Sequence, residues 1–262
     1  MHIGFDFDPE HKYWGEYVGA GREIYRGHEE LVRASIDSMM DMNGLVKAED
    51  ILKSWFPSVN ADIFLSHSHS DEKVVLGFAG WLHREMGVKA FIDSAVWGYS
   101  DVLLKQMDEY AKFPDSDMYN YSKRNRTTSH VHMMLSTALA DMIDRCECVI
   151  FMNTENSFKA SDYIDGVGET GSPWIYHEMM MSRIVRRREL SAHRGRRFKG
   201  AMDAALESLD EARDINISYP LNTLHLTKLD ARGIERWGAC GRKGHDALDA
   251  LYFMSRSGAC YG

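Results

Sequence analysis

Short apolar runs alternate with amphipathic stretches from residue 61 onward. The runs DIFLS, KAFIDS and CVIFMN have the length and apolar content of buried strands. Between the first two, DEKVVLGFAGWLHREMG carries apolar side chains at helical spacing, and Gly87 stands where such a helix should end. Strands that alternate with helices predict an α/β fold, a flavodoxin-like parallel sheet flanked by helices and joined by right-handed crossovers.

The remaining pattern divides the chain into two parts. DVLLKQMDEYAKF, STALADMIDRC and SPWIYHEMMMSRIV predict further helices, and TLHLTKL predicts a later strand. Residues 114–130 are polar and unpatterned, which predicts an inserted loop. Residues 1–59 contain two helix-like stretches, HEELVRASIDSMMDM and KAEDILKSWF, on either side of the turn signal Asn43-Gly44. We therefore expect an N-terminal helical extension (1–59) and a single α/β domain (60–262) with an extended C-terminal part.

Composition narrows the class of protein. The chain is 44% hydrophobic and 27% charged, which is ordinary for a globular protein. Its net charge of -8 disfavours nucleic-acid binding, which needs neutralising cations. No apolar run approaches the roughly 18 residues of a membrane span, and the N-terminus lacks a signal-peptide pattern. We expect a cytoplasmic protein that binds neither nucleic acid nor membrane. The basic cluster from Arg183 to Lys199 favours a solvated helix end over an anion-binding patch.

The loop SHSHSDE follows the first strand, at the edge of a parallel sheet where ligands bind. His67-x-His69-x-Asp71 has the spacing of a two-metal hydrolase, but Glu72 stands where that pattern continues with a histidine. His130-x-His132 lies too far along the chain to be a convincing replacement, so we expect no metal.

Two alternatives remain for this loop. Ser66, Ser68 and Ser70 are small and polar, and they lead into a helix N-terminus at Asp71 that favours a phosphate. The alternative for these residues is a capping turn that binds no ligand.

The segments GVGETG and SPWIYHE differ in what they indicate. GVGETG matches a nucleotide-binding fingerprint literally, but it does not directly follow a strand, so we interpret it as a loop.

In SPWIYHE, Ser172 is a natural N-cap and Pro173 suits the first helical turn. Trp174 and Glu178 are four residues apart and share one helix face. Either they form part of a site, or Trp174 packs under the loop while Glu178 is a surface charge.

Four segments occur in the order found in TIR (Toll/interleukin-1 receptor) domains. They are DIFLSHSHSDE, VKAFIDS with AVWGYSD, STALADMIDRCECVIFMNTENSF, and SPWIYHE. The chain resembles the bacterial, enzymatic branch of this family, such as TIR proteins of Thoeris-type antiphage defence. The resemblance covers about residues 61–190, whereas residues 1–59, the insertion at 114–130 and the long 190–220 segment depart from it.

The resemblance implies an NAD⁺ nucleosidase or cyclase, a hydrolase acting on N-glycosyl bonds. Glu178 of Trp174-x-x-x-Glu178 would be the catalytic residue, and NAD⁺ would be a substrate, with no cofactor. The expected substrate-binding residues are Ser66, His67, Ser68, Asp93, Trp97 and Trp174. Partners implied are a second copy of the chain, joined through the exposed Ser94–Ser100 loop, and a downstream effector that senses the product. The competing hypotheses are a non-catalytic TIR scaffold and a nucleoside deoxyribosyltransferase.

Overall fold

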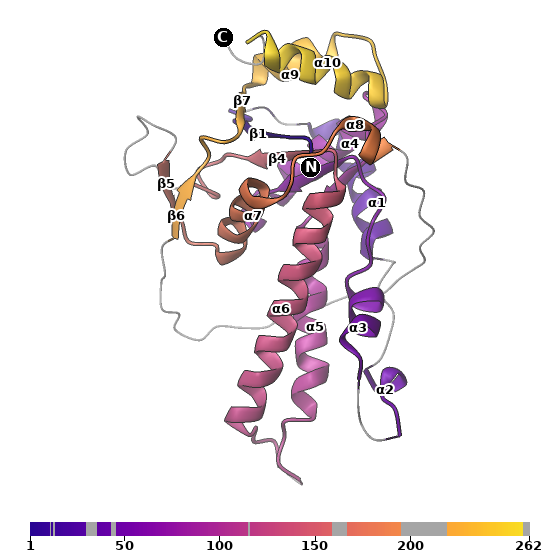
Figure 1. Ribbon diagram of the computed structural model, residues 1–262, viewed down its shortest axis with the longest axis vertical. Helices are drawn as coiled ribbons and strands as arrows, with labels where there is room; N and C mark the ends of the chain where they lie inside the picture. Colours follow the sequence, from indigo (N-terminus) through magenta and orange to yellow (C-terminus); the bar gives the residue numbers. More distant parts are fainter. Residues whose placement is uncertain are drawn as a thin grey trace.

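Five parallel strands form the centre of the protein in a computed structural model (Figure 1). The structure describes residues 1–10, 12, 14–29, 36–42, 46–114, 116–158, 167–194 and 219–258. The strands lie in the order β3-β2-β4-β1-β7, which confirms the predicted α/β fold with a parallel sheet. Their bounds are β1 (Ile3–Phe7), β2 (Ile63–Ser66), β3 (Ala90–Ile92), β4 (Cys148–Met152) and β7 (Thr227–Leu229).

The N-terminal segment is part of this sheet, and the division at residue 59 was wrong in that respect. β1 pairs with β4 on one side and with β7 on the other. β3, β2 and β4 take the first three positions of the flavodoxin-like order, and β1 fills the fourth position. The sequence does contain a signal for this strand, because Ile3, Phe5 and Phe7 alternate with polar residues or glycine.

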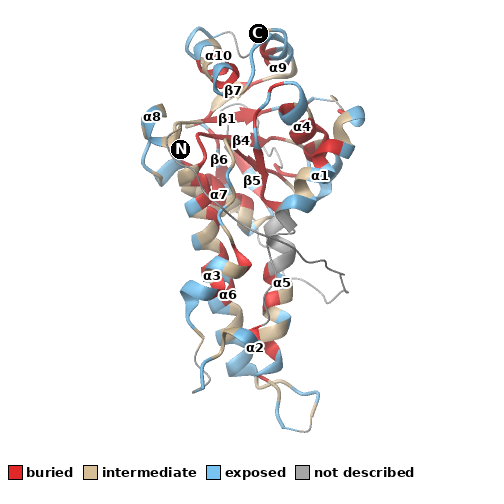
Figure 2. Ribbon diagram, turned by 90° about the vertical axis from the view of Figure 1, so that its right-hand side faces the viewer, coloured by how far each residue is buried: buried red, intermediate tan, exposed pale blue. Residues whose placement is uncertain are grey.

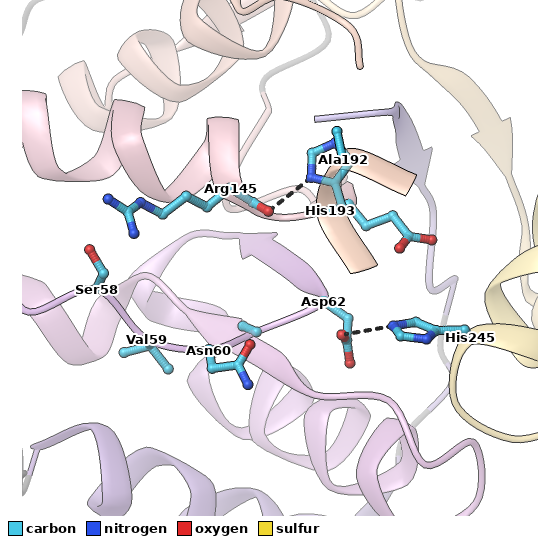
Figure 3. A pocket seen from close by; sticks show the side chains of 10 residues that line it. Ser58, Val59, Asn60, Asp62, Arg145, Ala192, His193 and His245 are labelled. Carbon is cyan, nitrogen blue, oxygen red and sulfur yellow. Dashed lines mark hydrogen bonds and ion pairs between the residues drawn. The ribbon is translucent and has the colours of Figure 1, made fainter. Parts of the chain in front are cut away.

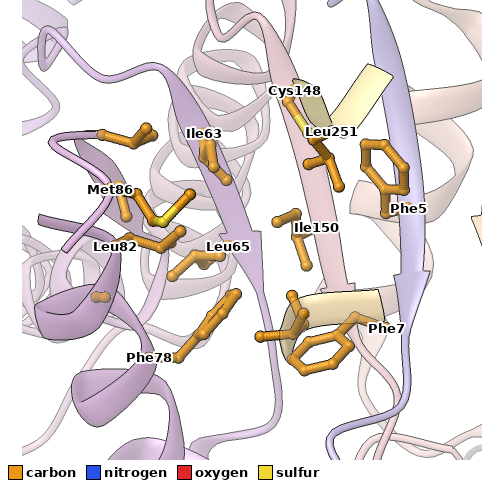
Figure 4. Close-up of a cluster of buried hydrophobic side chains, with 14 of the residues drawn as sticks. Phe5, Phe7, Ile63, Leu65, Phe78, Leu82, Met86, Cys148, Ile150 and Leu251 are labelled. Atoms are coloured by element: carbon orange, nitrogen blue, oxygen red, sulfur yellow. The ribbon is translucent and has the colours of Figure 1, made fainter. Parts of the chain in front are cut away.

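Successive strand residues face opposite sides of the sheet, and each side is covered by helices. On one side the strands pack against α1 (Val18–Glu29), α4 (Glu72–Arg84), α9 (Ala231–Gly238) and α10 (His245–Arg256). Figure 4 shows this core, in which Phe5 and Phe7 of β1 lie in one layer with Ile63, Leu65 and Phe78. The buried β1 side chains therefore belong to the main hydrophobic core.

The opposite side carries α2 (Ile36–Met39), α3 (Ala48–Trp55), α5 (Ser94–Glu109), α6 (Tyr121–Arg145) and α7 (Pro173–Ile184). The long helices α5 and α6 run side by side and project away from the sheet (Figures 1 and 2). Of the two helix-like N-terminal stretches, KAEDILKSWF forms α3. The other is described only as the end of α1 and as α2, because residues 30–35 and the Asn43-Gly44 turn lie outside the described residues.

The prediction of an inserted loop at 114–130 was wrong for its second half, because α6 begins at Tyr121. Asn120 caps this helix by accepting a hydrogen bond from the Lys123 backbone N–H at 3.0 Å. The first turns are exposed on all sides, so they show no apolar periodicity. Thr127 and Thr128 donate hydrogen bonds to backbone carbonyls one turn earlier, which gives their hydroxyls partners within the helix.

α1 and α4 approach each other closely at glycine positions. A Cβ atom on Gly21 would lie 1.8 Å from the carbonyl oxygen of Leu76, and one on Gly80 would lie 2.1 Å from that of Tyr17. Glycine is needed at both positions because the two backbones are in direct contact. This contact fixes the N-terminal helix against the first helix of the predicted α/β domain.

The expectation that GVGETG is a loop was also wrong over its described part. β5 (Val167–Thr170) pairs antiparallel with β6 (Tyr219–Asn222) to form a second, two-stranded sheet (Figure 1). This pairing explains the extended backbone without any nucleotide-binding role. Elsewhere in the described residues, short helices η1 (Gly15–Tyr17), η2 (His69–Asp71) and α8 (Leu190–Arg194) complete the fold. None of the described helices is both long enough and apolar enough to cross a membrane.

Candidate active site

A small cavity lies at the carboxyl ends of β2 and β3, where the start of α7 meets them. Its volume is about 120 Å³. The lining residues come from the loop after β2, the β3–α5 junction and the N-cap of α7; they are His67, Ser68, His69, Asp93, Ser94 and Ser172. The structure therefore brings together three segments that the sequence analysis assigned to one pocket.

Asp71 joins the loop after β2 to the loop after β4. It stands at the N-cap of α4 but makes no side-chain capping bond there. Its carboxylate instead accepts hydrogen bonds from Thr154 Oγ1 at 2.5 Å and from Asn156 Nδ2 at 2.7 Å. The start of α4 thus already holds one of the protein's own carboxylates, so a phosphate at this helix would meet a negative charge. Ser68, two residues into the loop, caps η2 by accepting from Ser70 N.

His67 and Asp93 form a buried ion pair, with His67 Nδ1 2.5 Å from Asp93 Oδ1. The same carboxylate oxygen accepts a hydrogen bond from the Ser94 backbone N–H at 2.8 Å, so Asp93 also caps α5. Burial by itself lowers the pKa of His67. The negative charge of Asp93 and the hydrogen bond to it outweigh burial, and the pKa is raised above its ordinary value of 6.5. The pairing with Asp93 therefore favours the protonated form of His67.

Glu178 lies behind the cavity and has no exposed surface. Ser66 Oγ donates a hydrogen bond to Glu178 Oε2 at 2.6 Å. Burial raises the pKa of Glu178 well above 4.5, the negative charge of Asp93 raises it further, and the bond from Ser66 acts in the opposite direction. Burial and the neighbouring Asp93 therefore both favour the neutral form of Glu178.

Several predicted site residues lie elsewhere than expected. Glu178 is not a surface charge, and neither it nor Ser66 lines the cavity, because the two are bonded to each other inside the protein. Trp174 packs on α6, with its ring edge-on to His132 at 5.6 Å between centroids, and it does not line the cavity. Residues 94–100 form the first turns of α5 and not a loop, while the Trp97 side chain lies outside the described part of the structure.

The H-x-H-x-D side chains have different partners in this structure. His67 is bonded to Asp93, and Asp71 is bonded to the loop after β4. Among the residues that the structure describes, no group of three or more histidine, cysteine, aspartate or glutamate side chains is arranged to hold a metal ion.

A second polar cluster, which the sequence analysis missed, lies on β1. Asp6 is buried, and its carboxylate accepts hydrogen bonds from Asn153 Nδ2 at 2.8 Å and from Lys228 Nζ at 2.5 Å. These three residues tie β1 to the end of β4 and to β7. Both oxygens of Asp6 have partners, so we interpret the cluster as structural.

A smaller hollow of about 50 Å³ lies at the amino ends of β2 and β4 (Figure 3). His193 and His245 face it, and Glu147 lines it. Glu147 is buried and bonded to both Arg194 and Tyr252, and Arg194 also bonds Asp249. This network holds α8 and α10 against the sheet.

The basic cluster was expected to be a solvated helix end, but its described part is only partly solvated. Arg188 and Arg194 form ion pairs with Asp144 and Glu147, and each arginine is less than one-third exposed. Residues 195–199 of the cluster lie outside the described residues.

Comparison of the chain with protein-family models, with curated proteins and with solved structures gives no match.

Proposed function

We propose that this protein is a TIR-type enzyme that cleaves the bond between nicotinamide and ribose in NAD⁺. The observation that carries the proposal is the Asp93–Glu178 carboxyl pair beside a cavity at the carboxyl ends of β2 and β3. Ligands of open parallel sheets bind at this edge. Strongly shifted pKa values of buried acids are also typical of functional sites.

The chemistry of the pair suits glycosyl cleavage. Breaking the bond to nicotinamide builds positive charge on the ribose, and a carboxylate nearby stabilises that charge. Asp93 lines the cavity, and Glu178 stands behind it with a pKa raised well above its ordinary value. Nicotinamide leaves without a strong acid catalyst. The water that attacks the ribose must lose a proton, and Asp93 presents a carboxyl group at the cavity wall that can accept it.

The size of the cavity supports an assembly of more than one chain. Ligand pockets usually have volumes of about 300 Å³ or more, whereas this cavity has about 120 Å³. One chain therefore encloses only part of a dinucleotide. A second copy of the chain, docked near the start of α5, would enclose the remainder, in agreement with the homo-oligomer implied by the TIR resemblance. An ADP-ribose-derived product would then act as a signal to a downstream effector in antiphage defence in the cytoplasm.

The test is incubation of the purified chain with NAD⁺, followed by measurement of nicotinamide and by mass analysis of the other product. Free ADP-ribose, a cyclic isomer or a conjugate would each support the proposal and define the product. Glu178→Gln should nearly abolish nicotinamide release, while Glu23→Gln, on the exposed face of α1, should not change it. Activity on nucleosides in place of NAD⁺ would support the deoxyribosyltransferase alternative. Failure to cleave either, at all protein concentrations, would support a scaffold.

A further inference from the structure

A groove separate from the candidate active site lies between α7 and β6, which are side by side (Figure 1). Its volume is about 220 Å³. The wall that α7 supplies consists of Tyr176, Met179, Met180 and Arg183. These positions follow one another at intervals of three and four residues, so they share one face of the helix. Glu178 lies on the opposite face, toward β2. A molecule in this α7–β6 groove would therefore not occupy the cavity at Asp93.

Most of the groove lining is apolar. Met179 and Leu221 are almost fully buried, and Pro220 adds a further apolar side chain from β6. The ring of Tyr176 stacks on Tyr219, with 5.2 Å between the ring centroids and 24° between the planes, which holds the aromatic part of the wall in place. Methionine side chains adapt to apolar surfaces of different shapes. The lining thus suits the apolar body of a ligand.

The two polar side chains that line the groove both offer hydrogen-bond donors. Oδ1 of Asn222 accepts from the Leu224 backbone N–H at 3.0 Å, so the amide nitrogen is the group that Asn222 offers to a ligand. Arg183 has no hydrogen bond or ion pair within the described part of the chain. A guanidinium binds a carboxylate through two parallel hydrogen bonds. Donors beside an apolar lining indicate a ligand with an apolar body and an anionic group.

The charges near the groove also favour an anion. Arg187 follows the end of α7 and donates a hydrogen bond to the carbonyl oxygen of His225 at 3.4 Å. Burial lowers the pKa of His225, and the positive charges of Arg183 and Arg187 lower it further. Among the described residues, the acids Asp144 and Glu147 pair with other arginines of the basic cluster. This end of the groove is therefore positively charged.

We propose that the α7–β6 groove binds a small organic acid, with its carboxylate on Arg183 and Asn222 and its apolar body along Met179 and Leu221. A single negative charge suits the groove better than a doubly charged phosphate, because the cost of burying a charge in apolar surroundings rises with its size.

The size and the walls of the groove favour a small molecule over a protein segment. Pockets for drug-sized ligands usually start at about 300 Å³, and this groove has about 220 Å³. Pro220 has no N–H to offer to an added strand, so β6 is poorly suited to bind a partner peptide by strand addition. The inference does not depend on NAD⁺ cleavage.

The experiment is a calorimetric titration of the full chain with hexanoate and with 4-phenylbutyrate, each compared with the alcohol of the same carbon skeleton. At least one acid should bind about tenfold or more tightly than its alcohol, because only the acid forms charged hydrogen bonds. Arg183→Gln should remove this preference by weakening the acid and leaving the alcohol unchanged, which loss of a merely structural arginine would not do. Asn222→Asp keeps the acceptor for the Leu224 N–H but replaces the donor with a negative charge. It should also weaken the acid about tenfold or more.

Arg186→Gln is the matched control, because Arg186 carries the same charge, is exposed and does not line the groove. It should leave the affinity for both acids unchanged. Equal weakening by Arg183→Gln and Arg186→Gln would reduce the effect to general electrostatic attraction and overturn the site. Equal affinities of the parent for acid and alcohol would overturn the role of Arg183, and no saturable binding of either acid would overturn the whole proposal. NAD⁺ cleavage by a chain that binds neither acid would overturn the groove site and leave the proposed function intact.

Discussion

The hydroxyl of Ser66 donates a hydrogen bond of 2.6 Å to Oε2 of Glu178, although the residues are 112 positions apart. Both side chains are fully buried. The bond joins the end of β2 to the second turn of α7 through an acid that has no contact with solvent. An ionisable group at such a position is expensive to bury, which favours a functional reason for its presence.

The ion pair between His67 and Asp93 should make the protein less stable as the pH rises. Below pH 6.5 His67 is protonated in the folded and unfolded chain alike, and the pair stabilises fully. Between 6.5 and the higher pKa of the folded state, only the folded chain holds the proton. Its free energy of unfolding should then fall by up to about 1.4 kcal/mol per pH unit. Urea denaturation from pH 6 to pH 9 measures this slope.

The control for that slope is His83, which is exposed on α4. His83→Gln should keep the parental slope, whereas His67→Gln should reduce it. Glu178 also has a raised pKa, so it too lowers the free energy of unfolding as the pH rises. Both histidine substitutions should therefore be compared in a chain that already carries Glu178→Gln. Equal slopes for the two histidine variants would show that the His67 pair does not titrate as described.

The contact between α1 and α4 should tolerate no side chain at Gly21. An added Cβ would lie 1.8 Å from the Leu76 carbonyl oxygen, so Gly21→Ala should destabilise by at least the roughly 1–3 kcal/mol typical of overpacking. Gly19→Ala in the same helix is the matched control, since nothing lies within 4 Å of its Cβ position. It should be neutral or stabilising by up to about 1 kcal/mol. Similar melting temperatures for the two variants would contradict the close approach.

The N-terminal strand should contribute to the stability of the whole sheet. Phe5 is fully buried between β4 and β7, so Phe5→Ala should cost about 3–5 kcal/mol. Phe113→Ala is the control, because that side chain is 47% exposed near the end of α5. A chain that starts at residue 60 should fail to fold. A stable, cooperative fold for the truncated chain would restore the division into an extension and a domain.

The strands and helices from residue 61 onward were predictable because their apolar spacing is regular. β2, β3, β4 and α4 follow from local pattern, and α7 follows from Ser172 and Pro173, which form its cap and first turn. β1 was missed although Ile3, Phe5 and Phe7 alternate with Gly4 and Asp6. The alternation does not show that Asp6 is buried, because its partners Asn153 and Lys228 are distant in sequence.

The site was predictable only in part. The sheet edge and the residues His67, Ser68 and Asp93 follow from loops after predicted strands, and all three line the cavity. The spacing of Trp174 and Glu178 places them on one helix face but does not say what covers that face. The packing of α7 decides this, since Trp174 contacts α6 while Glu178 points under β2. Such long-range contacts leave no periodic signal in the sequence.

Glu178→Gln should separate stability from activity. Glutamine is close in size to the neutral acid, and it can still accept the hydrogen bond from Ser66. Above pH 4.5 the unfolded parent releases a proton that folded Glu178 must retain, at a cost that grows by about 1.4 kcal/mol per pH unit. Glutamine removes this cost, so the variant should melt at or above the parental temperature at pH 7.5, and the difference should increase with pH.

The same variant should lose NAD⁺ cleavage. Without an acid behind Asp93, the pair can no longer redistribute its proton as charge develops on the ribose. The loss of one such electrostatic contribution costs about 3–4 kcal/mol, or roughly two to three decades in rate. Glu23→Gln should alter neither melting nor turnover. A stable Glu178→Gln variant that cleaves NAD⁺ at the parental rate would make Glu178 a structural residue and place the chemistry elsewhere.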